Sequence, residues 1–193
     1  MTYTTDFKHM SVIGICIGHS RSGDNGAVNT NGVSEHTFNS DIGRLTADLL
    51  RKEGHTVHVI DEYSGGSYSS AICWVSDYLT KLGVNVAVEL HFNSAGPFAE
   101  GHEWLHWFRS TKGQKLASCF NHAFKEAFPN AKVRGVKPAD KEDRGSLFLR
   151  ITRCPSVILE PFFGSNKKET EFYTKNKSAI AAAYAKALTD YLR

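Results

Sequence analysis

Four residues spread along the chain combine side-chain types that are found at hydrolytic metal centres. His19, His91 and Glu160 each stand at the end of a short apolar run, and Glu35 opens a stretch with helical periodicity. Such runs are typical of buried strands, and in open α/β sheets functional residues gather outside the carboxyl ends of the strands. If the three strands are parallel neighbours, their polar end residues meet at one edge of the sheet, close to Glu35.

Glu160 has the most unusual sequence surroundings of the four. It follows Val157-Ile158-Leu159 and precedes Pro161-Phe162-Phe163. A charge among apolar neighbours is costly unless it has a partner or a chemical role. This setting favours a functional carboxylate over an ordinary surface residue.

Two imidazoles and one carboxylate form a common catalytic zinc site, with a water molecule in the fourth position. Zinc lowers the pKa of that water to about 7, and a second carboxylate outside the metal shell can act as general base. The four residues therefore indicate metal-assisted hydrolysis, and the spacing alone leaves the roles of the two glutamates open. The remaining histidines are interpreted as ordinary hydrogen-bonded or surface residues: His9, His36, His55, His58, His102, His106 and His122.

The segments that would position these residues alternate between strands and helices, which predicts one α/β domain with a largely parallel or mixed sheet. Residues 131–146 are charged and are expected to be irregular, and 147–151 fit either a short strand or a helical turn. Strands are predicted at 11–17, 55–60, 84–90, 103–108 and 156–159. Helices are predicted from Glu35 to Gly54, at 71–82, at 113–128 and, as one amphipathic helix, at 167–192; the first carries Phe38, Ile42, Leu45 and Leu49 at helical spacing.

Composition excludes several other classes of protein. The chain has 193 residues, of which 41% are apolar and 22% charged, as in a soluble globular domain. A net charge of +3 without a basic run argues against nucleic-acid binding. The sequence contains no run of about 18 apolar residues, so no membrane span is predicted. Residues 1–10 lack the apolar stretch of a secretory signal, so we expect synthesis in the cytoplasm. The four distant cysteines, without a C-x-x-C pair, are expected to be reduced and packed as small hydrophobic residues: Cys16, Cys73, Cys119 and Cys154.

Several motifs, in this order, resemble the zinc-dependent N-acetylmuramoyl-L-alanine amidases of family 3, which occur in autolysins and phage endolysins. Ile15-Cys16-Ile17-Gly18-His19 is similar to the opening strand of that family, and Asn25-Gly26-Ala27 to its glycine-rich loop. Glu35, followed by Asn39, resembles its helix-borne metal glutamate. The second histidine motif is matched by Leu90-His91-Phe92-Asn93-Ser94-Ala95, and the catalytic glutamate strand by Pro155-Ser156-Val157-Ile158-Leu159-Glu160.

The resemblance implies one zinc ion bound by His19, Glu35 and His91, with Glu160 as the catalytic carboxylate. It also implies a mixed, mostly parallel sheet of about six strands with helices on both faces. The whole chain, 1–193, is then a single catalytic domain with a core at about 11–193 and no separate wall-binding domain. Ile17, Ser20 and Pro161-Phe162-Phe163 depart from the usual family pattern, which bears on specificity rather than on the four chemical groups.

The expected reaction is hydrolysis of the amide between N-acetylmuramic acid and L-alanine in peptidoglycan, by a monomeric phage lysin or autolysin that reaches the wall through a route such as a holin. Asn93 and Arg144 are candidate substrate contacts, and 20–31 and 137–144 would line the groove. Three alternatives remain: a zinc peptidase that cuts the wall peptide, a non-catalytic wall-binding module, and a cysteine hydrolase that uses Cys154. Pro155 follows that cysteine where a helix start would be needed to lower its pKa.

Overall fold

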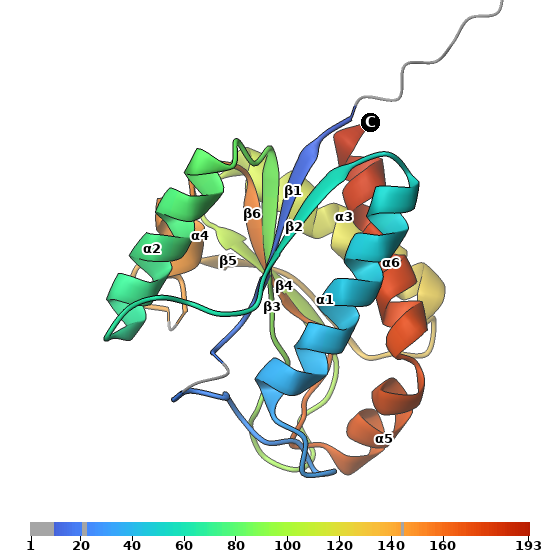
Figure 1. Ribbon diagram of the computed structural model, residues 1–193. Helices are drawn as coiled ribbons and strands as arrows, with labels where there is room; N and C mark the ends of the chain where they lie inside the picture. Colours follow the sequence, from blue (N-terminus) through green and yellow to red (C-terminus); the bar gives the residue numbers. More distant parts are fainter. Residues whose placement is uncertain (1–9, 21–22, 144) are drawn as a thin grey trace, which may run out of the picture.

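A six-stranded mixed sheet forms the centre of the protein, as predicted (Figure 1). The computed structural model describes residues 10–20, 23–143 and 145–193. The strand order is β2-β1-β3-β6-β4-β5; the first four strands are parallel to one another, and β4 runs antiparallel to β6 and parallel to β5. The last strand in sequence, β6, therefore lies between β3 and β4. The strands are β1 (Val12–Ile17), β2 (Thr56–Ile60), β3 (Val86–Leu90), β4 (His102–Trp107), β5 (Val133–Ala139) and β6 (Ser156–Glu160).

Helices cover both faces of this sheet, which confirms the predicted three-layer architecture. On one face, α1, α3 and α6 pack over a large core that includes Phe38, Phe120 and Tyr184. On the other face, α2 and α4 pack over a smaller core. The helices are α1 (Glu35–Lys52), α2 (Tyr68–Lys81), α3 (Thr111–Ala127), α4 (Leu147–Ile151), α5 (Lys167–Lys175) and α6 (Lys177–Leu192).

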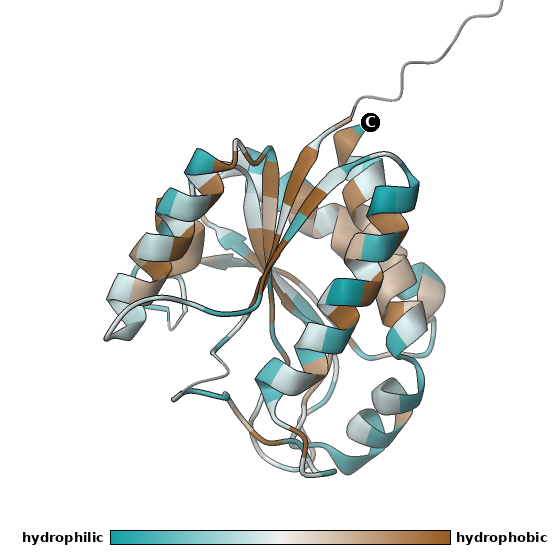
Figure 2. Cartoon of the chain, in the orientation of Figure 1, coloured by the Kyte–Doolittle hydropathy of each residue, from teal (hydrophilic) through white to brown (hydrophobic). Residues whose placement is uncertain are grey.

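The central strands are apolar on both faces because both faces are covered (Figure 2). In β1, Ile13, Ile15 and Ile17 enter the larger core, whereas Cys16 enters the smaller one. Gly14 faces the smaller core at a place where a Cβ atom would lie 2.5 Å from a methyl group of Leu79. The close contact between β1 and α2 thus depends on a residue without a side chain.

Several elements differ from the sequence prediction. Residues 133–139 form the edge strand β5 rather than an irregular segment; its mostly exposed side chains give it no apolar pattern. The predicted helix at 167–192 is interrupted at Asn176, which separates α5 from α6. Leu45 is 39% exposed, because the buried stripe of α1 continues through Thr46 and Leu50 instead. Residues 147–151 are helical.

The cysteines are free, as predicted, although Cys73 is exposed rather than packed. In the described part of the chain, no helix is both long enough and apolar enough to cross a membrane.

The carboxyl ends of β1, β3 and β6 meet at one edge of the sheet, as the sequence predicts for parallel neighbours. The backbone ladder continues past the strand ends, because Gly18 N donates to Leu90 O and His91 N donates to Leu159 O. The antiparallel strand β4 begins at this same edge, where Glu103 lies in register with Glu160. The edge therefore receives polar residues from four adjacent strands.

Candidate metal centre

His19 is fixed at the end of β1 by an unusual backbone conformation. Its φ is 69°, in the left-handed region that is costly for a residue with a side chain. The preceding residue must be small, because a Cβ atom on Gly18 would lie 2.2 Å from the His91 ring. On the other side, Gly26 has a φ of 72°, and a Cβ atom there would lie 2.5 Å from the His19 ring. The two glycines thus let the chain close tightly around both imidazoles.

Glu35 is the first residue of α1, and Ser34 caps that helix by accepting a hydrogen bond from Thr37 N. The carboxylate is 4% exposed and receives donors on both oxygens. Oε1 lies 2.7 Å from His91 Nδ1 and accepts from Phe92 N, and Oε2 lies 3.2 Å from His19 Nε2 and accepts from Ala27 N. Burial opposes its charge, but the contacts with the two histidines prevail and lower the pKa of Glu35 to about 2.

His91 lies between two carboxylates at the end of β3. Its Nδ1 faces Glu35, and its Nε2 lies 3.4 Å from Glu89 Oε2. Burial disfavours the charged ring, but the hydrogen bonds to the two glutamates outweigh burial and raise the pKa of His91 well above its ordinary value. The two histidine rings stand edge to face, with centroids 5.2 Å apart.

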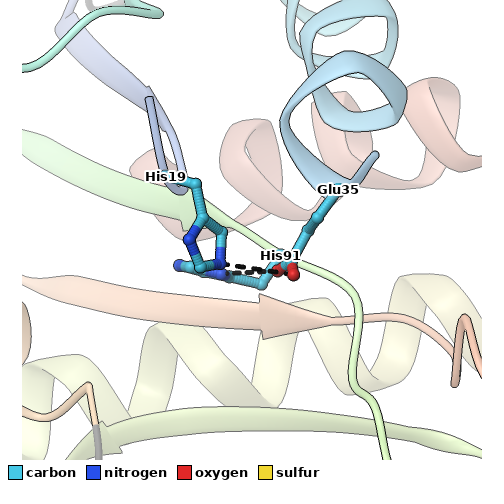
Figure 3. Close-up of side chains that lie close together, drawn as sticks. All are labelled: His19, Glu35 and His91. Carbon is cyan, nitrogen blue, oxygen red and sulfur yellow. Dashed lines mark hydrogen bonds and ion pairs between the residues drawn. The ribbon is translucent and has the colours of Figure 1, made fainter. Parts of the chain in front are cut away.

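One potential ligand atom from each of His19, Glu35 and His91 falls within 4.8 Å of the other two (Figure 3). Figure 3 shows both rings pointing toward the carboxylate from different elements, β1 and β3, while Glu35 comes from the start of α1. Two imidazole nitrogens and one carboxylate oxygen match the ligand set of catalytic zinc sites. The donor chemistry and the glycine-lined packing therefore fit a zinc ion held by these three residues.

Glu160 lies beside this cluster and differs from Glu35 in its partners. It follows Leu159, whose carbonyl accepts from His91 N, and it lies in register with Glu103 on the neighbouring strand β4. Its Oε2 atom is buried, and no described residue donates a hydrogen bond to it. Burial raises the pKa of Glu160 to about 8, and the negative charges of Glu35 and Glu103 add to this effect.

The two predicted substrate contacts have different outcomes. Asn93 lies at this edge, but its Nδ2 donates to Glu103 Oε1 at 2.7 Å, so the side chain is engaged within the protein. Arg144 lies outside the described residues. Sequence reasoning missed Arg134 on β5, whose Nε donates to Glu103 Oε2 at 2.7 Å and whose guanidinium lies over the Phe163 ring. A charged residue on an unrecognised edge strand carries no signal in sequence.

No other histidine among the described residues joins the cluster. His9 lies outside the described residues. His36 turns away from Glu35, and its Nε2 lies 2.6 Å from Asp61 O. His102 is buried among aromatic rings. Burial also raises the pKa of Cys154 to about 11, which is the reverse of what a cysteine nucleophile needs.

Comparison with known proteins places this geometry in a family context. A family described as N-acetylmuramoyl-L-alanine amidase matches residues 13–190. The catalytic domain of the amidase CwlV from Bacillus (Paenibacillus) polymyxa var. colistinus is 25% identical, with a TM-score of 0.80 over 95% of this chain and 98% of that one. The catalytic domain of the CD27L endolysin targeting Clostridia difficile is also 25% identical, with a TM-score of 0.79 over 93% and 97% of the two chains.

A third structure shares the fold at lower identity. The CwlD amidase from Clostridioides difficile, in complex with the GerS lipoprotein, is 23% identical, with a TM-score of 0.83 over 94% of this chain and 98% of that one. No curated protein matches the sequence.

Proposed function

Since this chain belongs to the N-acetylmuramoyl-L-alanine amidase family, we propose that it is a zinc-dependent enzyme that hydrolyses the amide between N-acetylmuramic acid and L-alanine in peptidoglycan. The observation that carries the zinc dependence is the convergence of His19, Glu35 and His91 within 4.8 Å. The observation that supports catalysis is a fourth group, Glu160, which lies at the same edge with an oxygen that no described residue uses.

In this proposal His19, Glu35 and His91 hold the metal. Zinc, when bound there, supplies a Lewis acid that polarises the amide carbonyl and lowers the pKa of a water molecule to about 7. Glu35 suits a ligand role because its pKa of about 2 keeps it ionised throughout the neutral range. Each of its two oxygens also contacts one of the two imidazole rings.

Glu160 is proposed to be the general base and then the general acid. It accepts one proton from the attacking water as the new carbon–oxygen bond forms at the lactyl carbonyl. It then donates this proton to the alanine nitrogen as the carbon–nitrogen bond breaks, so that the products are a free carboxyl group and a free amine. A raised pKa suits a group that must both take and return a proton near neutral pH, and a nearby cation would favour its ionised form before reaction.

We further propose that the enzyme works on the wall as a phage lysin or autolysin and as a monomer. Asn93 and Arg144 remain candidate substrate contacts. Asn93 is held by Glu103, so its contribution would come through the carbonyl oxygen of its amide, which also accepts from Ser94 N.

The decisive experiment combines metal removal with product analysis on purified peptidoglycan. Protein treated with a chelator should lose wall hydrolysis, and added zinc should restore it. The products should carry new L-alanine amino termini. Full activity after verified metal removal would refute zinc dependence, whereas new amino termini of any other wall residue would instead identify a peptidase.

A further inference from the structure

A second carboxylate, Glu89, is buried behind the proposed metal ligand His91. Glu89 is 3% exposed and stands in β3, between the parallel strands β1 and β6. Its neighbours on this face of the sheet include Cys16, Ala87 and Ile158, which belong to the smaller apolar core. An ionisable residue at such a position is expensive unless hydrogen bonds and charge partners compensate for the loss of water.

Glu89 has two such partners, one on each oxygen. Tyr63, from the loop after β2, donates its hydroxyl proton to Oε1 at 2.9 Å, and Oε2 lies 3.4 Å from His91 Nε2. Side chains alternate along a strand, so residues 89 and 91 project from the same face of β3. The spacing of two residues therefore places the carboxylate directly alongside the imidazole.

This contact bears on which nitrogen of His91 would keep its proton when a metal ion is bound. A neutral imidazole has one N–H donor and one nitrogen with a free lone pair. Glu89 sits at Nε2 and favours a proton there, whereas Nδ1 lies 2.7 Å from Glu35, on the side where the three ligand atoms converge. If a metal ion replaces the proton between Nδ1 and Glu35, Glu89 would keep the remaining proton on Nε2 and leave the Nδ1 lone pair for the metal.

The other ligand histidine has a matching arrangement in which the two nitrogens exchange roles. Asp24 Oδ2 lies 3.0 Å from His19 Nδ1, and the second Asp24 oxygen accepts from Gly26 N. His19 Nε2 is then the nitrogen that faces Glu35. The side chain of Asp24 is 68% exposed, whereas that of Glu89 is 4% exposed.

We propose that Glu89, held by Tyr63, is a positioning residue that fixes the Nε2–H tautomer of His91 and so raises the affinity of the site for zinc. The inference rests on the proposed function, because it takes His91 as a metal ligand. Carboxylates that orient ligand histidines in this way typically contribute about 10- to 100-fold in metal affinity or activity. Water can replace the exposed Asp24 more readily than the buried Glu89, so Glu89 carries the larger effect.

The test measures the zinc dissociation constant of the full chain by competition with a chromophoric chelator. Glu89→Gln keeps the size of the side chain but removes its charge, and it should weaken zinc binding by roughly 10-fold or more. Tyr63→Phe and Asp24→Asn should each weaken it by less. Long-range nitrogen–proton NMR of the zinc-loaded protein should show His91 as the Nε2–H tautomer in the parent protein, and a mixed or altered state in Glu89→Gln.

Glu169→Gln is the matched control. Its carboxylate accepts hydrogen bonds from Gly101 N and Phe163 N but contacts no proposed ligand, so zinc affinity should not change. Equal zinc affinity and an unchanged tautomer in a folded Glu89→Gln protein would overturn the inference. So would complete loss of zinc at saturating concentration, because Glu89 would then be a ligand. A parent protein that binds no zinc would instead overturn the proposed function.

Discussion

Two glutamates at the same edge of the sheet have pKa values that are shifted in opposite directions from the ordinary value. Glu35 receives contacts from two imidazoles and two backbone N–H groups, and its pKa falls to about 2. Glu160 has a buried oxygen without a donor among the described residues and two carboxylates nearby, and its pKa rises to about 8. Burial acts in the same direction on both residues, so the difference comes from their partners.

This difference separates the chemical roles that the sequence alone left open. A carboxylate that stays ionised and braces two imidazoles suits a metal ligand, whereas one that exchanges a proton near neutral pH suits a general base. Pairs of ionisable groups whose surroundings push their pKa values apart mark acid–base assignments in many enzymes. The predictions below test whether the two glutamates differ in function as they differ in environment.

The largest effect is expected from Glu35→Ala. Removing this carboxylate takes away one of three ligands, so zinc content should fall from about one ion per chain to background and wall hydrolysis should stop. His19→Ala and His91→Ala should behave in the same way. Metal analysis and release of L-alanine amino groups are the measurements. His36→Ala is the control, because its ring contacts Asp61 O on another side of α1; zinc loss in this variant with retention in Glu35→Ala would place the ligand one residue away.

Glu160→Gln should separate catalysis from metal binding. The amide keeps the shape of the side chain but cannot accept a proton, so activity should fall by roughly two to four orders of magnitude while zinc content and binding to wall sacculi remain. Loss of zinc would make Glu160 a ligand. A normal rate would transfer the proton role to another carboxylate, with Glu103 the first to examine.

The same variant should change how stability depends on pH in chelator-treated protein. The folded pKa of Glu160, about 8, lies above its ordinary value of 4.5, so its contribution to stability is complete below pH 4.5 and is lost as pH rises through 8. Between pH 6.5 and 8 the free energy of unfolding of Glu160→Gln should gain roughly 1–2 kcal/mol relative to the parent. Denaturant titrations at several pH values measure this gain.

Two histidines also affect stability in this pH range. Burial lowers the pKa of His102 to about 4, so this residue is neutral throughout the window in the folded chain, and its titration in the unfolded chain is the same for both proteins. His91 loses stabilising charge as pH rises, but it is present in both proteins and largely cancels in the difference. Parallel stability curves for the two proteins would show that Glu160 has no raised pKa.

The smallest effect is expected from Glu103→Gln. Glu103 faces Glu160 in register, and its charge raises the pKa of Glu160. Neutralising it should lower the midpoint of the Glu160 transition by roughly a few tenths of a pH unit, whereas the exposed control Glu126→Gln should leave it unchanged. The amide at position 103 keeps one acceptor oxygen, so it can replace the carboxylate toward either Asn93 or Arg134 but not toward both. A shift to higher pH would contradict the electrostatic explanation.

The sequence was sufficient to bring the four candidate residues to one edge of the sheet because each of them begins or ends a recognisable element. His19, His91 and Glu160 follow apolar strands, and Ser34 before Glu35 marks a helix start. The alternation of strands and helices also predicted the sheet and its two covered faces. These features follow local rules of apolar periodicity and helix capping that operate over a few residues.

Features that depend on distant partners were missed. β5 is held by backbone pairing with β4 at the sheet edge, so its exposed residues needed no apolar pattern. Asn176 interrupts the C-terminal helical region without a glycine or proline signal. Glu89 offered one usable clue, a carboxylate two residues before a strand-end histidine, but its hydrogen bond with Tyr63 joins residues 26 positions apart and could not be read from local sequence.

The position of β6 within the sheet has a consequence for biosynthesis. This strand is the last of the six in sequence, yet it pairs with β3 on one side and β4 on the other. Domains fold largely as units during synthesis from the N-terminus, and long-range strand pairing forms late. A nascent chain that has emerged only as far as β5 holds all three proposed metal ligands but lacks both Glu160 and the strand that joins β3 to β4. Any activity that depends on Glu160 therefore cannot arise on the ribosome before β6 has been translated.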